Sequence, residues 1–193
     1  MADRLRPPVC RRPNRLPAYD YARAGAYFVT VCTRDRQQLF WCGSDAVAAH
    51  SVRQPWQGPS PEIHLAPLPA GTALSAAGRA AVDAIGEIPQ RYPMVTVDVC
   101  AVMPNHVHLL LQIHGGEDGR TLCAPTISRV VKQWKEAVTK KLHSPVWQRS
   151  FHDRVIRDEA EYRLVGEYIL TNPARWRQDC FHPSALSAKE NTS

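Results

Sequence analysis

The chain has 193 residues, of which 44 % are hydrophobic and 22 % charged, and its formal net charge is +6. This length and composition are typical of one soluble domain with its own core, and no apolar run reaches the ~18 residues of a membrane span. The basic excess favours a polyanionic partner, although charge alone is equally consistent with an ordinary basic protein.

The cysteines and the first residues bear on the compartment. No two of the six cysteines stand in a Cys-x-x-Cys spacing. Cys32 and Cys100 fall in strand-like segments, where a free cysteine behaves as a small hydrophobic residue. The N-terminus is basic but has no apolar stretch, so it does not predict a secretory signal. We expect reduced cysteines, no zinc site and a cytoplasmic location.

The N-terminal part predicts a basic arm, a strand and a long excursion. Residues 1–16 are rich in Pro and Arg and predict an irregular arm. Residues 25–33 (GAYFVTVCT) are rich in aromatic and β-branched residues, which predicts a strand. Residues 41–72 have little periodicity and many turn-forming residues. They predict a loop-like excursion with room for a short hairpin.

A helix and a second strand follow. Residues 73–88 are rich in Ala and place apolar side chains at helical spacing, with Ser75 as the expected N-cap. Pro89 and Pro93 are expected to end this helix. Residues 94–102 (MVTVDVCAV) predict the next strand, and a Met-Pro-Asn turn leads out of it.

The C-terminal part predicts a strand, a helix, another strand and a last helix. Residues 106–113 (HVHLLLQI) predict a strand, and residues 124–142 predict an amphipathic helix. Residues 146–156 predict an extended segment or strand. Residues 158–172 predict a helix that Asp158 caps.

The element order is β-α-β-β-α-β plus one more helix. This order predicts an α+β protein with a ferredoxin-like core, in which two helices pack on one face of an antiparallel sheet. The last helix can then lie over or beside the other face. We assign residues 17–177 to this domain and residues 178–193 to a C-terminal tail.

Two histidines stand two residues apart in an apolar strand. Because strand side chains alternate between faces, His106 and His108 share a face with Leu110 and Gln112. The intervening residues are expected to pack against the two helices. Paired imidazoles on the uncovered face can bind one divalent ion. From the spacing alone, two hydrogen-bonded core histidines are as good an explanation as a metal-binding pair.

The last predicted helix carries Tyr168 and Asn172 on one side. They are four residues apart, so they lie one above the other on a helix. A phenol and an amide presented to a metal would form half of an active site. Each residue also has a plainer explanation: Tyr168 could pack in the core, and Asn172, which precedes a proline, could simply close the helix.

Four segments, taken in order, resemble one protein family. They are YFVTVCTRDR, MPNHVH, WQRSFHDRVIRD and EYILTNP. MPNHVH resembles the HUH motif (His, hydrophobic, His) of single-tyrosine HUH nucleases, and the whole series is similar to the REP-associated tyrosine transposases. The resemblance covers roughly residues 12 to 177.

This resemblance implies a metal-dependent enzyme that acts on single-stranded or hairpin DNA. His106 and His108 match the metal-binding pair for Mg²⁺ or Mn²⁺, and Asn172 matches a polar residue that completes the site. Tyr168 matches the nucleophile, which would cleave and rejoin DNA through a 5′-phosphotyrosine. Tyr162, six residues earlier, should point elsewhere.

Several basic residues are candidates for DNA contacts. They are Arg11, Arg12, Arg15, Arg34, Arg36, Arg154 and Arg157. Trp147 and Phe151 could stack on bases, although burial is at least as good an explanation. We expect no membrane partner, and the sequence leaves open whether the protein forms a homodimer.

Other functions compete with this one. A catalytically inactive relative could recognise palindromic repeats without cutting them. An RNA-binding sheet of the RRM type is less suitable, because the strand 106–113 lacks the expected aromatic residues. Replication initiators and relaxases with the HUH motif usually have longer chains.

Overall fold

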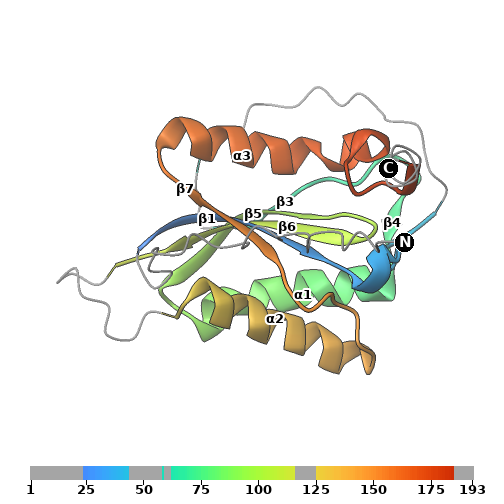
Figure 1. Ribbon diagram of the computed structural model, residues 1–193, viewed down its shortest axis with the longest axis horizontal. Helices are drawn as coiled ribbons and strands as arrows, with labels where there is room; N and C mark the ends of the chain where they lie inside the picture. Colours follow the sequence, from blue (N-terminus) through green and yellow to red (C-terminus); the bar gives the residue numbers. More distant parts are fainter. Residues whose placement is uncertain (1–23, 44–57, 59–61, 116–124, 185–193) are drawn as a thin grey trace, which may run out of the picture.

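A computed structural model describes residues 24–43, 58, 62–115 and 125–184. Helices α1 (Ala76–Arg91) and α2 (Ile127–Leu142) cover one face of a five-stranded sheet. Helix α3 (Glu159–Thr171) lies across the other face, so the protein has three layers (Figure 1). The predicted arm, residues 1–16, lies outside the described residues.

The sheet has the order that a ferredoxin-like fold requires. Its four main strands are β1 (Gly25–Cys32), β5 (Val95–Val102), β6 (His106–Ile113) and β7 (His152–Ile156). They lie side by side in the order β5-β6-β1-β7, and each pair is antiparallel. Helices α1 and α2 provide the two crossovers, so the predicted α+β fold class is confirmed.

The predicted excursion, residues 41–72, begins in one short strand and is followed directly by another. β2 (Trp41–Cys42) pairs with β4 (Ala73–Leu74) in a separate two-stranded sheet. β3 (His64–Leu65) adds a parallel edge strand beside β5. Residues 44–57 and 59–61 of the excursion lie outside the described residues.

Helix α1 begins where the sequence indicated but ends later. The Ser75 side chain accepts a hydrogen bond from the backbone N–H of Gly78, at 3.1 Å. The prediction that Pro89 ends the helix is wrong, because the helix continues to Arg91. In the last turn Pro89 removes only one backbone hydrogen bond, and the next available one, from Tyr92 N to Ile88 O, forms at 2.8 Å.

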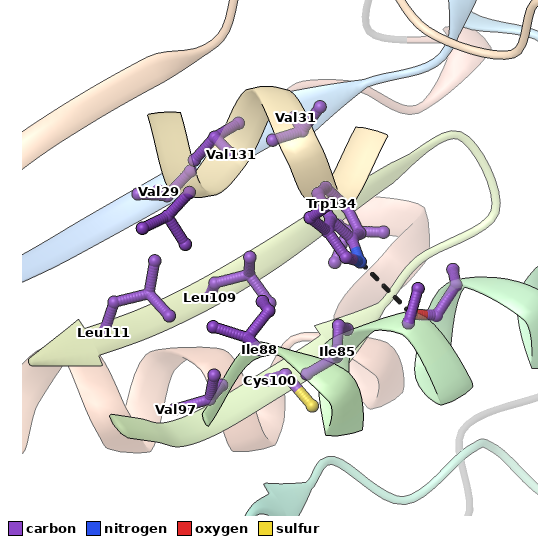
Figure 2. Packing of buried hydrophobic residues seen from close by; sticks show 14 of the residues in the cluster. Val29, Val31, Ile85, Ile88, Val97, Cys100, Leu109, Leu111, Val131 and Trp134 are labelled. Carbon is purple, nitrogen blue, oxygen red and sulfur yellow. Dashed lines mark hydrogen bonds between the residues drawn. The ribbon is translucent and has the colours of Figure 1, made fainter. Parts of the chain in front are cut away.

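The main core fills the space between the sheet and helices α1 and α2. Alternate residues of β1 and β6 point into it, and they meet apolar side chains of both helices (Figure 2). The indole N–H of Trp134 donates to the carbonyl of Ala81 at 3.3 Å, which ties α2 to α1.

A second core lies between the opposite sheet face and helix α3. Val99 and Leu110 of the sheet meet Tyr162, Val165 and Ile169 of the helix. His106 and His108 share the face of Leu110, so the predicted division of the β6 side chains between the two faces is confirmed. Helix α3 therefore lies on the histidine side of the sheet.

Helix α3 has the predicted cap and a continuation that the sequence did not indicate. Oδ1 of Asp158 accepts a hydrogen bond from the backbone N–H of Glu161 at 2.8 Å. A 3-10 helix, η2 (Pro173–Gln178), follows directly. Beyond it, the first residues of the predicted tail are folded against the domain, with Asp179 buried. Within the described ranges, no helix is both long and apolar enough to cross a membrane.

Candidate metal and tyrosine site

The two imidazoles of β6 face each other at the end of the sheet. Nε2 of His106 lies 3.0 Å from Nε2 of His108, and both side chains are buried, with exposed fractions of 0 % and 2 %. Their ring centroids are 4.5 Å apart. The predicted pair therefore converges on one point rather than spreading along the strand.

Neighbouring side chains set the protonation of both rings. Nδ1 of His106 lies 2.8 Å from Oδ1 of Asn105, an acceptor, so Nδ1 carries the proton and Nε2 keeps its lone pair. Nδ1 of His108 lies 2.9 Å from Oγ1 of Thr30, its neighbour across β1. When this hydroxyl accepts, the Nε2 lone pairs of both rings face each other, an arrangement that a cation would stabilise.

Burial keeps both rings neutral. It lowers the pKa of His108 to about 3. It also lowers the pKa of His106 well below its ordinary value, with further contributions from His108 and Arg36. A neutral imidazole is the form that binds a metal ion.

Asp179 adds a carboxylate that the sequence did not indicate. Its Oδ2 lies 3.9 Å from Nε2 of His106. One ligand-type atom from each of Asp179, His106 and His108 lies within 4.8 Å of the others. Asp179 follows the 3-10 helix η2, so no strand or helix periodicity connected it to the histidines.

This donor set fits a divalent cation. Two ligands at right angles around an ion such as Mg²⁺, each about 2.1 Å from it, lie about 3 Å apart, which matches the 3.0 Å between the imidazole nitrogens. Two nitrogens and a carboxylate oxygen suit several divalent metals and do not identify one.

Helix α3 brings Tyr168 to the same place. The rings of Tyr168 and His108 have centroids 5.5 Å apart, and Phe28 of β1 lies against both. The Tyr168 side chain is 43 % exposed, so it reaches solvent while the imidazoles do not. The sequence left Tyr168 either as part of an active site or as a core residue, and this exposure excludes burial in the core.

Asn172 contacts the tyrosine. Its Nδ2 donates to the Tyr168 hydroxyl at 3.3 Å, and its side chain is buried. Burial, together with the nearby Asp179 and Cys180, raises the pKa of Tyr168 to about 12, while the Asn172 bond opposes this rise. A positive charge at the histidine pair would favour the phenolate and lower this pKa.

Residues after α3 cover His106. The ring of Phe181 packs on it at 4.7 Å between centroids, and Trp176 lies 6.1 Å away. The Asn105 side chain donates to the carbonyl of Phe181 at 2.8 Å. The guanidinium of Arg36 also lies over the Phe181 ring, 4.5 Å from its centre. A ligand approaching the imidazoles must therefore displace this cover or pass beside it.

The arginines predicted to contact DNA lie in different parts of the structure. Arg11, Arg12 and Arg15 lie outside the described residues. Arg34 is exposed, and half-buried Arg36 lies close enough to the site to lower the pKa of His106. Arg154 lies in β7 and forms an ion pair with Glu161 of α3, and Arg157 is exposed between these two elements.

Three further aromatic residues can now be placed. Trp147 is buried against Phe40 and Trp134, so it is a core residue and cannot stack on bases. Phe151 is half-buried. Tyr162 points away from the histidines, as predicted, and its hydroxyl donates to Asp98.

The chain is similar in sequence to two proteins of Haemophilus influenzae. No family model matches. An "Uncharacterized protein" of Haemophilus influenzae is 29 % identical over 188 residues, covering 88 % of this chain and 91 % of the relative. A "Putative REP-associated tyrosine transposase" of the same organism is 27 % identical over 110 residues, covering 48 % of this chain and 62 % of the relative.

A solved structure has the same fold. It is a REP-associated tyrosine transposase bound to a REP hairpin, and it is 20 % identical with a TM-score of 0.55. The match covers 84 % of this chain and 74 % of the other. The fold and the family resemblance that the motifs predicted are thus both confirmed.

Proposed function

We propose that this chain, which resembles the REP-associated tyrosine transposases in fold and motifs, is a metal-dependent DNA endonuclease and strand transferase. Its substrate would be hairpin or palindromic DNA with a single-stranded part. The observation that carries the proposal is the convergence of His106, His108 and Tyr168 on one face of the sheet. The Nε2 atoms of the two imidazoles are 3.0 Å apart, and Tyr168 is next to His108.

The chain's own residues would bind a divalent ion, Mg²⁺ or Mn²⁺, and align the tyrosine. His106 and His108 supply two nitrogens, Asp179 a carboxylate, and the predicted ligand Asn172 lies beside them against Tyr168. When bound, the ion supplies positive charge to a phosphate and to the developing charge of the reaction. Arg36 is near enough to add a second positive charge.

The reaction would exchange one phosphoester for another. Oη of Tyr168 attacks phosphorus, the bond from phosphorus to the 3′ oxygen of the upstream strand breaks, and the 5′ phosphate stays on the tyrosine. The phenol proton leaves to solvent, which the half-exposed side chain reaches, and the departing 3′ oxygen gains a proton. The bond energy is retained, so a 3′ hydroxyl can reverse the step and rejoin strands without ATP.

A covalent-adduct assay tests this proposal. A labelled hairpin from a palindrome that flanks the gene is incubated with protein and Mn²⁺ or Mg²⁺, and the product is separated under denaturing conditions. We expect an adduct whose tryptic mass places the nucleotide on Tyr168, and none with Tyr168→Phe or with EDTA. Tyr92→Phe, which removes a hydroxyl bonded to Gln133 away from the site, is the matched control and should react normally.

The alternative is a binding protein that recognises palindromic repeats without cutting them. The buried imidazoles and the Phe181 cover favour it, because they restrict access to the site. Tight hairpin binding without an adduct under any metal condition would support this function and exclude the nuclease.

A further inference from the structure

A groove of about 600 Å³ lies between helix α2 and the extended residues 145–151, on the sheet face opposite α3. One stripe of α2 forms its first wall, and the chain after α2 forms the second. The residues of interest here are Lys132, Lys135, Lys140, Trp147, Arg149 and Phe151.

The groove is built on fixed backbone. Trp147 forms part of its floor, and its indole N–H donates to the carbonyl of Lys135 at 3.1 Å. The ammonium of Lys135 donates to the carbonyls of Gln148 and Arg149, at 2.6 and 3.2 Å. Gln148 N donates to Cys32 O at 3.0 Å, so the second wall is also attached to the end of strand β1.

The walls are basic where they are exposed. Lys132, Lys140 and Arg149 are accessible or partly accessible, and Glu136 is the acidic residue among the lining side chains. Lys132 lies 3.7 Å from Glu136, but both side chains are exposed, so this pair is weak. Lys135 is occupied by two carbonyls and does not contribute a free ammonium.

Phe151 adds an aromatic surface to these charges. Its side chain is half-buried and lines the groove on the side of Arg149. Basic side chains along a groove, with an aromatic ring among them, are the combination that binds single-stranded nucleic acid, since phosphates pair with the charges and bases stack on the ring.

The groove also connects to the candidate metal site. Cys32 is the cross-strand partner of His106, and Thr33 forms an isolated bridge with Trp147 and donates from its N–H to the carbonyl of Asn105 at 2.9 Å. The next residue, Arg34, donates from its N–H to the carbonyl of Val146 at 2.8 Å.

Residues 32–34 therefore border both the groove and the histidines, at one end of the sheet. The short helix η1 (Arg34–Arg36) continues from them. Exposed Arg34 and half-buried Arg36 thus provide a basic path from the groove to the histidine face.

We propose that this groove holds the single-stranded DNA that adjoins the bond cut at the metal site. The inference rests on the proposed function for the identity of the ligand. The strand would lie along Lys132, Lys140 and Arg149, stack a base on Phe151, and pass over Arg34 around the end of the sheet.

Binding without chemistry tests the inference separately from the nuclease. Fluorescence anisotropy is measured in EDTA, in a Tyr168→Phe background, with a labelled hairpin that has or lacks a single-stranded extension. The test variant combines Lys132→Gln, Lys140→Gln and Arg149→Gln. The matched control is Arg129→Gln, an exposed arginine of the same helix that does not line the groove.

We expect the triple variant to bind the extended hairpin about tenfold more weakly, and its slope of log affinity against log salt to fall by about 2, since each single-strand phosphate contact contributes about 0.7. Phe151→Leu should weaken binding of a normal extension but not of an abasic one. Thermal unfolding shows that each variant is folded, and Lys140→Gln alone replaces the triple variant should that variant unfold.

Equal affinity and equal salt slope for the triple variant and Arg129→Gln would overturn the inference. So would polyglutamate competing as well as oligothymidylate, because the groove would then suit an acidic protein. If groove variants lose DNA binding while the wild type forms no adduct, the groove is still a binding site for single-stranded DNA, and the nuclease proposal fails. If the wild type forms an adduct and the groove variants bind DNA normally, the nuclease proposal stands and the inference about the groove fails.

Discussion

The hydroxyl of Tyr162 on helix α3 donates to the carboxylate of Asp98, at the point where strand β5 changes register with β6. Gln112 of β6 donates to the same hydroxyl at 2.8 Å. Asp98 and Tyr162 are both buried, and burial raises the pKa of each. This contact joins α3, the helix of Tyr168, to two strands of the sheet.

Replacing Tyr162 with Phe should loosen this attachment. The change removes the hydroxyl and leaves buried Asp98 without that donor, which we expect to cost about 1–3 kcal/mol in the free energy of unfolding. Adduct formation should slow more than hairpin binding weakens, because Tyr168 is positioned by the same helix. Urea unfolding and adduct kinetics measure the two effects, and Tyr92→Phe serves as the control. An unchanged unfolding midpoint would contradict the stabilising role of this bond.

Asn105→Ala should weaken metal binding. Asn105 holds Nδ1 of His106 in its protonated form and so leaves Nε2 free for a ligand role. Loss of such a supporting contact typically lowers metal affinity by ~10- to 100-fold. Isothermal titration with Mn²⁺ gives the affinity. Thr96→Ala is a suitable control, because the Thr96 hydroxyl bonds His114, just after β6, and not the histidine pair. Wild-type affinity in Asn105→Ala would show that the tautomer is set in another way.

Asp179→Asn and Asn172→Ala separate the two candidates for a further ligand. Asp179 lies close to His106, whereas Asn172 donates a hydrogen bond to the hydroxyl of Tyr168. We expect Asp179→Asn to lower Mn²⁺ affinity by about tenfold or more, since a charged oxygen donor is lost. Asn172→Ala should mainly lower the rate at which Tyr168 forms the adduct, measured at saturating metal. A larger loss of Mn²⁺ affinity in Asn172→Ala would reverse this assignment.

Stability should fall as the pH drops below the ordinary pKa of histidine. Below about pH 6.5 the unfolded chain binds protons that the folded protein, in which the pKa of His108 is about 3, does not bind. Each such imidazole then removes about 1.4 kcal/mol of stability per pH unit. Urea unfolding in EDTA, between about pH 7 and pH 5.5, measures the slope. A His106→Gln/His108→Gln variant should show a flatter slope, and an equal slope would mean that other groups cause the effect.

The fold could be predicted because its local and global signals agree. Alternating apolar residues in β1 and β6, the caps at Ser75 and Asp158 and the order of the elements all indicate the same sheet. The errors arose where one local signal was given too much weight. Pro89 lies so near the end of α1 that the helix tolerates it, and β3 consists of two residues that only their pairing with β5 reveals.

The candidate site could be predicted only in part. His106, His108 and Tyr168 lie on a regular strand and helix, where spacing determines which face a side chain occupies. Asp179 lies in an irregular segment, and Thr30 reaches His108 through a cross-strand pair, so no spacing rule connects them to the histidines. The sequence also gave no sign that Phe181 would cover His106.

The late position of Asp179 affects how the protein is made. Thr30 and His108 are far from each other along the chain and far from Tyr168 and Asp179, and the four residues meet only in the finished fold. During synthesis, the complete group cannot form until Asp179 has left the ribosome tunnel. A nascent chain that already displays both histidines would therefore still lack the carboxylate of the complete group.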